Sequence, residues 1–299
     1  MLDDQDPYLD PKTGLLRNLV GATSQAQLDQ IEVAFSSIRH LELIERPIVG
    51  AFDMRHLQAI HKHLFGDVYP WAGEIRTVLI DKGQTRFAMP HRIEPEGVKF
   101  FQLLAKDNHL KGLDAGRFTV RAARYMGEIN VLHPFREGNG RTQRAFMSQL
   151  AREAGYSLTW IGITREEMTK ACIEAFYGDS DILAGLIARN LTDLEPAQAY
   201  ELAQAKAAVP VELTMAAEGG DYAGCVIGET SRYVVQEIVD QPGQVVLHRR
   251  SQLVAPSADL TVGTVARIRY PHGGAGLVEA ERSAKAASEK CIEIGAREL

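Results

Sequence analysis

The sequence lacks the cysteine patterns that mark disulfide-rich or zinc-binding proteins. Cys172, Cys225 and Cys291 are odd in number, widely spaced and not arranged as CxxC. This pattern supports neither a disulfide framework nor a zinc site. We therefore expect three buried thiols.

Long apolar runs are absent as well. No run approaches the roughly 20 residues that a helix needs to span a bilayer. Residues 1–7 are acidic and contain no apolar core of the kind found in a secretory signal. We therefore expect a cytoplasmic protein with no membrane partner.

Positive charge is not in excess either. The net charge is −6. The parts before and after residue 209 each net −3, with 24 basic against 27 acidic residues in the first and 9 against 12 in the second. A protein that coats nucleic acid needs positive surface to displace counterions, so the net charge argues against this role and leaves only a local cationic patch open. The 45% of hydrophobic residues is the share of an ordinary globular protein with a core.

The pattern up to about Tyr200 is helical, with apolar residues at three- and four-residue spacing between capping residues. Asp53 is the expected N-cap of a second helix, Pro95 is expected in the first turn of a third, and residues 164–167 fit a capping box. A helix is expected from Arg141 to Ala154, closed by Gly155. The expected buried stripes are Leu28, Ile31, Phe35 and Ile38; Leu57, Ile60 and Leu64; Val98, Phe101 and Leu104 or Ala105; and Phe118, Ala122, Tyr125 and Ile129.

Two regions are β-prone. Residues 73–90 contain two short runs around residues 81–84, which indicates a hairpin that either covers the bundle or grips an extended peptide by strand addition. After Pro210, short β-prone runs alternate with Gly, Pro and Ser, and a terminal helix is expected from about Glu279. The expected fold is mainly α: a helical bundle with a hairpin over residues 1–195, a helical connector over 196–209 and a small β-rich domain over 210–299.

Residues 132–144, LHPFREGNGRTQR, combine groups that can hold, neutralise and attack a nucleotide phosphate. If a helix begins near Asn139 or Gly140, the preceding loop presents backbone N–H groups at a positive dipole end. Gly138 and Gly140 allow an anion to approach closely. Arg141 and Arg144 lie three residues apart and direct two guanidinium groups from one helical face. This arrangement suits a polyphosphate.

Three neighbours complete the candidate site. Glu137 among phosphates is expected to bind Mg²⁺, which bridges phosphate oxygens. His133, whose ordinary pKa lies near neutrality, is the expected general base for an incoming hydroxyl. Phe135 is expected to pack into the bundle and fix the loop.

The stretch from His133 to Arg144 resembles the Fic-family signature, H-x-F-x-(D/E)-G-N-(G/K)-R-x-x-R, at every defined position. Residues 65–76 and the hairpin also resemble the Fic domain, so the likeness covers roughly residues 1–195. It implies transfer of AMP from ATP to a Ser, Thr or Tyr hydroxyl of a target protein, with Mg²⁺. The family roles assigned by this resemblance are deprotonation by His133, Mg²⁺ binding by Glu137, α- and β-phosphate binding by Gly138, Asn139 and Gly140, β-phosphate contact by Arg141 and γ-phosphate contact by Arg144.

The resemblance also assigns the hairpin. It would be the family's flap, which docks the target segment as an added strand. The docking residues would be Ile80, Asp81, Lys82, Gly83, Thr85 and Phe87.

Fic proteins are often inhibited by a helix bearing (S/T)-x-x-x-E-(G/N). Residues 214–219 match it with Thr214, Glu218 and Gly219, and a short helix over residues 210–218 would carry them. The alternative, which we favour, is that Glu218 and Gly219 form a turn into the β-rich domain. A separate small antitoxin protein would then inhibit the enzyme.

The segment over residues 218–230, with the runs at 234–236 and 248–253, is similar to the KfrB-type module of plasmid-borne proteins. This likeness suggests a toxin on a mobile element. A cationic surface for DNA or a partner is one interpretation of the basic residues in this domain, and a solvated edge is the favoured one. These residues are His248, Arg249, Arg250, Arg267 and Arg269.

Two alternatives to AMP transfer stay open. Some relatives of the family transfer a phosphate, UMP or phosphocholine, although Gly140 in place of lysine resembles the AMP-transferring members. A non-catalytic plasmid-maintenance binding protein is the other alternative. His133 and Glu137 weigh against it, because a scaffold requires neither.

Overall fold

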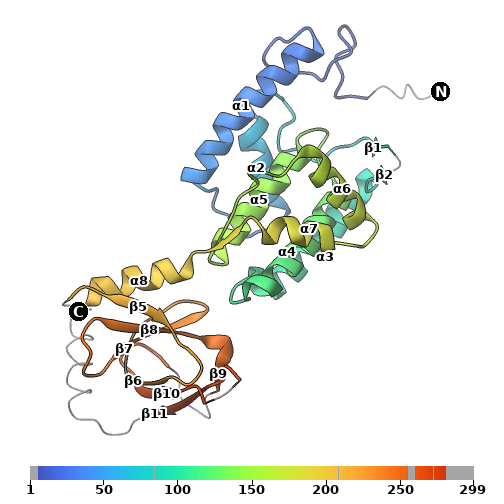
Figure 1. The fold of residues 1–299 in the computed structure, drawn as a ribbon. Coiled ribbons are helices and arrows are strands. Elements are labelled where there is room, and N and C mark those ends of the chain that lie inside the picture. Colours follow the sequence, from blue (N-terminus) through green and yellow to red (C-terminus); the bar gives the residue numbers. More distant parts are fainter. Residues whose placement is uncertain (1–5, 84, 208, 255–259, 272, 281–299) are drawn as a thin grey trace. The chain divides into compact units, whose positions relative to one another are not determined.

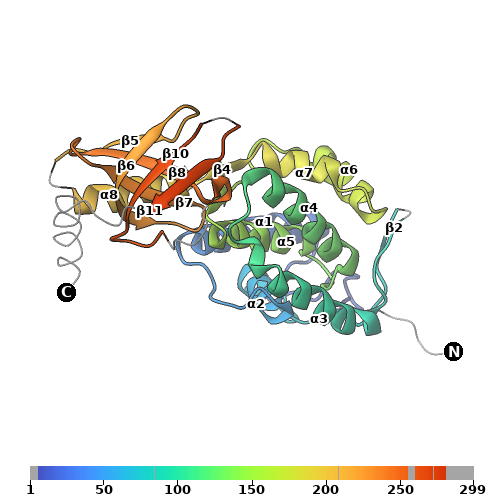
Figure 2. The same cartoon turned by 90° about the horizontal axis from the view of Figure 1, so that it is seen from below.

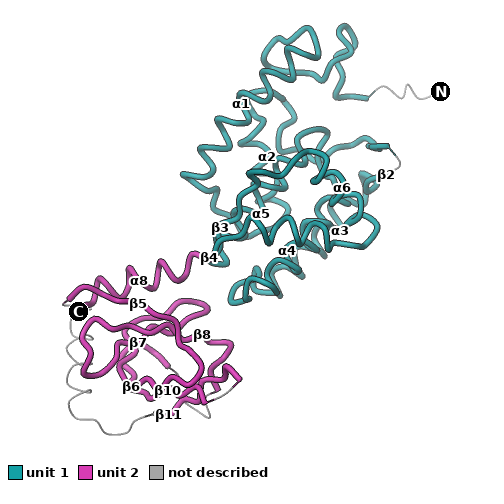
Figure 3. The backbone as a smooth tube through the Cα atoms, in the orientation of Figure 1, with its two compact units in different colours: residues 1–192 teal, residues 193–299 magenta. Residues whose placement is uncertain are grey.

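The structure is a computed structural model that describes residues 6–83, 85–207, 209–254, 260–271 and 273–280. The chain forms two compact units, residues 1–192 and 193–299 (Figure 3). This division differs from the expected one, because the helix expected as a connector belongs to the second unit.

The first unit is a bundle of helices (Figure 1). A 3₁₀ turn, Asn108–Leu110, separates the third helix from the fourth. The helices are α1 (Gln25–Glu45), α2 (Met54–Phe65), α3 (Pro90–Lys106), α4 (Ala115–Leu132), α5 (Asn139–Glu153), α6 (Arg165–Phe176) and α7 (Asp181–Ala188).

The centre of the bundle is formed by α4 and α5, which lie against each other and are flanked by α2, α3, α6 and α7 (Figure 2). The expected stripes of α2 and α4 are buried, and so are Phe101 and Leu104 of α3. The predicted stripe of α1 is wrong beyond Leu28, since Phe35 is 40% and Ile38 57% exposed. Val98 of α3 is also exposed.

The capping residues act largely as the sequence predicts. Asp53 accepts a hydrogen bond from the His56 N–H, and Thr164 and Glu167 form the capping box of α6. Helix α3 begins earlier than expected, at Pro90, so Pro95 lies inside it. Helix α5 begins at Asn139, the start on which the phosphate-site argument depends and two residues before the Arg141 of the expected range.

Two small two-stranded sheets accompany the helices. The predicted hairpin is present as β1 (Asp81–Lys82) and β2 (Thr85–Arg86), with Asp81 opposite Arg86 and Lys82 opposite Thr85. Strands β3 (Tyr156–Leu158) and β4 (Leu191–Asp193) pair with each other.

The second unit is a seven-stranded sheet in the order β5-β8-β7-β6-β10-β11-β9. The β-prone runs of the sequence at residues 222–227, 232–239, 244–248 and 262–270 appear in it. The strands are β5 (Glu212–Met215), β6 (Asp221–Glu229), β7 (Tyr233–Ile238), β8 (Gln244–Arg249), β9 (Leu253–Val254), β10 (Val265–Arg269) and β11 (Gly276–Ala280), with a 3₁₀ turn at Arg250–Gln252. The pairs β5–β8 and β9–β11 are parallel, and the others are antiparallel.

Side chains alternate across this sheet and build two separate cores. Cys225 and Ile227 pack with Ala199 and Ala203 of α8 (Glu195–Lys206), whereas Val226, between them, packs in the cluster of the other face. The helix expected as a connector is therefore part of this unit, because its alanines complete one of the cores.

Three further expectations have mixed outcomes. Cys172 is a half-buried free thiol, Cys225 is buried, and Cys291 lies outside the described residues. Glu279 lies in strand β11 and starts no helix, and residues 281–299 of the expected terminal helix lie outside the described residues. Within the described part of the chain, no helix is both long and apolar enough to cross a membrane.

Candidate active site

The signature residues form a tight loop between α4 and α5. His133 ends α4 in the left-handed region with φ 42°, and its N–H donates to the Ile129 carbonyl. Gly138, with φ 81°, starts α5, and a Cβ there would lie 2.4 Å from the Phe65 ring. The loop can therefore turn this closely only with glycine at position 138.

Asn139 holds the loop closed from inside. Its Oδ1 accepts from the Phe135 N–H at 2.9 Å, and its Nδ2 donates to the Phe135 carbonyl at 2.6 Å. Asn139 is 8% exposed. Its side chain is thus engaged in shaping the loop, and only its backbone N–H remains for a phosphate.

Phe135 is buried, as expected, and stacks on His61 of α2 with ring centroids 3.9 Å apart. His61 Nδ1 accepts from the Gly73 N–H at 2.8 Å, and Nε2 lies 2.9 Å from the Glu137 carbonyl, to which it donates in the matching tautomer. Burial lowers the pKa of His61 to about 4. The imidazole is therefore a neutral brace between α2 and the loop.

Arg76 is a second brace and is 1% exposed. Its guanidinium donates to the carbonyls of His133, Val78 and Ala88 at 2.8, 2.6 and 2.6 Å. Its backbone N–H donates to the Pro134 carbonyl at 2.8 Å. These bonds tie both ends of the hairpin to the loop, and burial lowers the pKa of Arg76.

The start of α5 leaves several donors without a partner. The first backbone bond of this helix runs from the Thr142 N–H to the Gly138 carbonyl. No described residue accepts from the N–H groups of Asn139, Gly140 or Arg141. The N-terminus of α5 therefore leaves three backbone donors unengaged by the described residues, at the position where the sequence predicts an anion site.

Arg144 adds an uncompensated charge beside these donors. It is half-buried, and its guanidinium makes no ion pair or hydrogen bond with the described residues. Burial, and then the charge of Arg141, lower the pKa of Arg144. A buried cation without a counterion costs free energy, which a bound anion would recover.

Arg141, by contrast, is engaged by α1. It donates to Glu32 Oε1 and, at 3.0 Å, to Ser36 Oγ, and its Cζ lies 4.7 Å from the centre of the Phe65 ring. The two arginines that the sequence pairs thus have different surroundings.

His133 is 6% exposed and stacks on Phe87 at a centroid distance of 3.7 Å. Burial, with the charges of Lys82 and Arg76, lowers the pKa of His133 to about 3. The expected ordinary pKa is therefore corrected. Burial keeps the imidazole neutral at physiological pH and makes it a weaker base than an exposed histidine. The Nδ1 of His133 is buried and has no hydrogen-bond partner among the residues that the structure describes.

Glu137 lies half-buried at the same loop, with Oε1 accepting from the Gly138 N–H at 2.9 Å. Among the described residues, no group of three or more His, Cys, Asp or Glu side chains could hold a metal on its own. A single carboxylate fits Mg²⁺ that takes its other ligands from substrate phosphates and water.

The hairpin residues lie over this site with different exposures. Phe87 and Thr85 are buried, Ile80 is half-buried, and Asp81, Lys82 and Gly83 are exposed. Phe87 also contacts Phe176 of α6, with centroids 6.4 Å apart. The hairpin is thereby fixed above His133 at its base and open at its tip.

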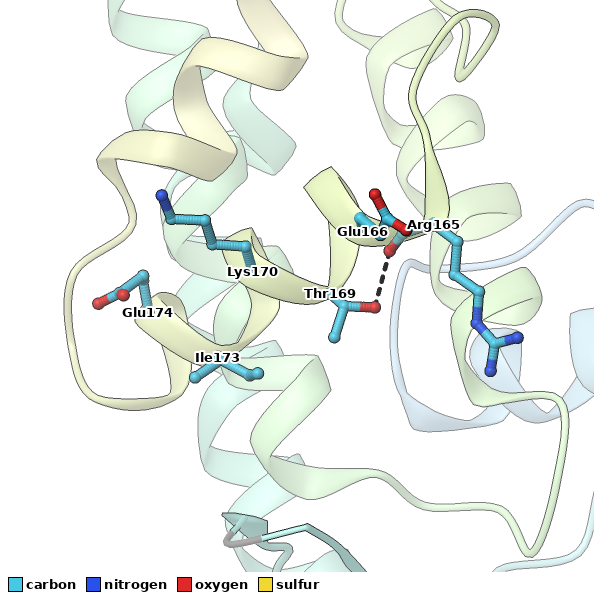
Figure 4. A pocket seen from close by; sticks show the side chains of 6 residues that line it. All are labelled: Arg165, Glu166, Thr169, Lys170, Ile173 and Glu174. Atoms are coloured by element: carbon cyan, nitrogen blue, oxygen red, sulfur yellow. Dashed lines mark hydrogen bonds between the residues drawn. The ribbon is translucent and has the colours of Figure 1, made fainter.

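Helix α6 carries a shallow hollow on its exposed face, lined by one stripe of its side chains (Figure 4). Thr169 bonds back to the Arg165 carbonyl at 2.7 Å, and Ile173 is 43% exposed. No signature residue lines this hollow.

The candidate inhibitory residues lie in the second unit and form no helix. Thr214 is in strand β5, and Gly219 turns with φ 80°. Glu218 Oε1 accepts from the Gly273 N–H at 3.1 Å. The favoured alternative, a turn into the β-rich domain, is the conformation found.

The basic residues of the second unit are largely engaged. Burial lowers the pKa of His248 to about 4, and its ring nitrogens lie 3.0 Å from Tyr270 Oη and Gln236 Oε1. Arg250, Arg267 and Arg269 pair with Glu229, Asp221 and Glu279. These side chains resemble a solvated, paired edge more than a free cationic surface.

Comparison with known proteins follows the same division of the chain. Residues 51–151 match the model of the Fic/DOC family, and residues 221–279 match the KfrB domain. The "Probable protein adenylyltransferase Fic" of Escherichia coli is 37% identical over 191 residues, which cover 64% of this chain and 94% of that protein. The chain belongs to the Fic/DOC family.

A second relative is the protein adenylyltransferase VbhT of Bartonella schoenbuchensis, which is 51% identical over 199 residues. The match covers 67% of this chain but 42% of VbhT. The chain therefore spans less than half the length of this relative.

Two solved Fic-family structures share the fold of the first unit. The N-terminal Fic domain of a cell filamentation protein from Bartonella quintana, with bound ADP, has a TM-score of 0.60 and 30% identity, covering 63% of this chain and 95% of that one. BepC from Bartonella tribocorum, with bound AMPPNP, has a TM-score of 0.58 and 29% identity, covering 62% and 96%.

Sequence reasoning missed the residues that brace the loop. Glu32, His61 and Arg76 each form a hydrogen bond with a signature residue. These signature residues lie 109, 76 and 57 residues further along the chain, respectively. A histidine or an arginine among apolar residues in the sequence does not by itself indicate that its side chain is buried. One clue was present, since Arg76 closes the segment that resembles the family.

Proposed function

We propose that the protein is an adenylyltransferase that transfers AMP from ATP to a Ser, Thr or Tyr hydroxyl of a target protein. The observation that carries this proposal is the set of unpaired donors at the start of α5 beside the unpaired guanidinium of Arg144. The names of the relatives support it. Solved Fic structures with bound ADP or AMPPNP support ATP as the substrate.

Binding of the triphosphate tail is assigned to the loop and α5. The α- and β-phosphates would accept from the N–H groups of Asn139 and Gly140, with Gly138 allowing the close approach. Arg141 would contact the β-phosphate and Arg144 the γ-phosphate. Burial of the Arg144 cation without a counterion costs free energy. A bound phosphate would supply the counterion and remove this cost, which favours binding.

In the chemical step the target hydroxyl oxygen attacks the α-phosphorus. The bond from that phosphorus to the oxygen bridging to the β-phosphate breaks, and pyrophosphate leaves. The hydroxyl proton passes to His133, which is neutral and can accept it. Positioning and charge stabilisation account for most of the rate enhancement of such transfers.

Glu137 would hold Mg²⁺, which neutralises phosphate charge when bound. The hairpin would dock the target segment, because its two-residue strands leave backbone groups free at an edge directly above His133. Docking would use Ile80, Asp81, Lys82, Gly83, Thr85 and Phe87.

Labelled ATP tests the proposal against its alternatives. Incubation with α-labelled ATP is expected to place label on protein. Label from γ-labelled ATP alone would support a kinase, and label from neither would support a binding protein.

The biological setting is proposed as that of a bacterial toxin in the cytoplasm, restrained by a small antitoxin protein. The support is the KfrB domain, which the sequence likens to plasmid-borne modules, and the absence of a helix at residues 214–219. Co-purification of an inhibitory protein encoded beside the toxin gene would test it. Full activity of the enzyme in its host without such a protein would contradict it.

A further inference from the structure

Arg141 has a carboxylate partner on a distant helix. Its Nη2 donates to Oε1 of Glu32, which is 8% exposed, and the Tyr69 hydroxyl donates to the other oxygen, Oε2. Burial raises the pKa of Tyr69, so this hydroxyl keeps its proton. A buried carboxylate is stable only when its oxygens are hydrogen-bonded, and both oxygens of Glu32 are.

The Arg141 guanidinium is held on three sides. Glu32 binds Nη2, Ser36 Oγ accepts from Nη1 at 3.0 Å, and the Phe65 ring covers one face. A guanidinium has five N–H donors. These contacts engage two, so three remain for a ligand.

Glu32 is not positioned as an imitation of phosphate. Among the described residues it accepts from Arg141 and Tyr69 and from no backbone N–H. The N–H groups at the start of α5, which an anion in the site would engage, have no acceptor. Glu32 therefore contacts the arginine without closing the anion site.

We propose that Glu32, assisted by Ser36 and Tyr69, is a positioning residue that fixes Arg141 so that its free N–H groups face the β-phosphate of ATP. The inference rests on the proposed function, since it requires a nucleotide at this loop. Pre-ordering of a flexible side chain removes an entropic cost that binding would otherwise incur.

The test measures binding of AMPPNP with Mg²⁺ by calorimetry to the full chain and its Glu32→Gln variant. Loss of the carboxylate charge is expected to weaken binding about tenfold. The matched control is Glu42→Gln. Glu42 lies on the same helix and pairs with an arginine, Arg39, at 2.8 Å, so its replacement is expected to change binding less than about twofold.

A double-mutant cycle separates positioning from a general structural role. If Glu32 acts through Arg141, Glu32→Gln added to Arg141→Ala is expected to weaken binding no further. With a target protein, Glu32→Gln is expected to raise KM for ATP about tenfold while kcat changes less than about twofold, since the contact is present in both the ground and transition states.

Equal or tighter nucleotide binding by Glu32→Gln would overturn the inference. If its Tm is also lowered, Glu32 has a structural role only. If the wild-type chain binds no AMPPNP, the proposed function fails as well. If Glu32→Gln does not fold, Ser36→Ala takes its place, with an expected loss of about threefold that disappears in the Arg141→Ala background. An unchanged affinity for Ser36→Ala would then contradict the inference.

Discussion

One buried network in the second unit and the signature loop of the first unit differ in how their polar groups are engaged. In the second unit, Glu195 is 2% exposed and accepts from the Thr230 hydroxyl and the Arg232 N–H at 2.5 and 2.8 Å, and it also pairs with the Arg232 guanidinium. In the first unit, His133 Nδ1 and the Arg144 guanidinium have no partner among the described residues. A network with its donors and acceptors paired serves the fold, whereas unmet donors and charges that gather at one loop make that loop a candidate for contact with a ligand.

The same contrast separates the histidines. His248 is buried and bridges Gln236 and Tyr270, so both its nitrogens are engaged. His133, which is 6% exposed, is stacked against Phe87, and its Nδ1 has no partner among the described residues. His109 Nε2 is buried without a partner as well, so this feature alone does not identify the catalytic candidate. His133 is the candidate because it also lies at the start of the signature loop, beside the open N-terminus of α5.

The largest expected effect comes from His133→Ala. Loss of the general base is expected to reduce AMP transfer about 10³-fold, because acid–base catalysis contributes on this order. Nucleotide affinity is expected to stay within about threefold of wild type, since the loop donors remain. Transfer of α-label to a verified target and calorimetry with ATP measure the two quantities. Undiminished transfer would exclude His133 as the base.

Glycine substitutions compare the two units at almost the same backbone angle. Gly138 has φ 81° and Gly219 φ 80°, but a Cβ meets the Phe65 ring at 2.4 Å in the first case and nothing within 4 Å in the second. Gly138→Ala is expected to reduce ATP affinity about 100-fold by displacing the loop. Gly219→Ala is expected to cost only about 1 kcal/mol of stability, with binding unchanged. Calorimetry and thermal unfolding measure both, and equal effects would remove the distinction.

The pH dependence of transfer sharpens the comparison of the histidines. An ordinary histidine is about 97% protonated at pH 5, which would reduce kcat/KM about thirtyfold. The folded pKa of His133, about 3, lies below its ordinary value, so the neutral base persists as the pH falls and this loss is not expected above pH 5. Phe87→Ala, which exposes the ring, is expected to shift the acidic limb upward. An acidic limb near 6.5 in the wild type would contradict the account.

Replacement of one arginine in each unit is expected to change nucleotide affinity less than Gly138→Ala does. Arg144→Ala is expected to weaken ATP binding about tenfold, since it removes an unpaired cation from the anion site. Arg267→Ala is the matched control. It removes an exposed arginine bonded to Asp221 at 2.7 and 2.6 Å, so nucleotide affinity is expected to stay constant and stability to fall by at most about 1 kcal/mol. Equal affinities for the two variants, measured by calorimetry, would show that Arg144 does not bind phosphate.

The smallest expected effect is that of Glu218→Gly. Residue 218 lies after strand β5 and bonds to the Gly273 N–H, so no inhibitory helix is lost by the change. We expect autoadenylylation to remain at the wild-type level, as followed by α-label on the enzyme itself. A several-fold gain would restore an internal inhibitor.

Local patterns predicted much of the fold. Asp53 and Thr164 cap helices because their side chains meet nearby N–H groups, and the stripe of α4 is buried because its spacing fits one helical face. Phe35 and Ile38 have the same spacing but are exposed. Periodicity identifies an apolar face and does not tell whether a neighbour covers it.

The candidate site was predictable where its residues are contiguous. The signature supplied His133, Glu137 and both arginines, and the structure brings them together around one loop. The altered pKa of His133 was not predictable, because it arises from Phe87, Lys82 and Arg76, which only folding brings near. Strand β5 was not among the expected β-prone runs, since its pairing with β8 is a contact between distant segments.

The central claim is that the start of α5, with Arg141 and Arg144, holds the triphosphate of ATP next to His133. A crystal structure of the chain with AMPPNP and Mg²⁺ tests it most directly. The account predicts phosphate oxygens within hydrogen-bond distance of the N–H groups of residues 139–141 and of both guanidinium groups, with the α-phosphorus facing His133. Nucleotide bound elsewhere, with these groups left unpaired, would contradict it.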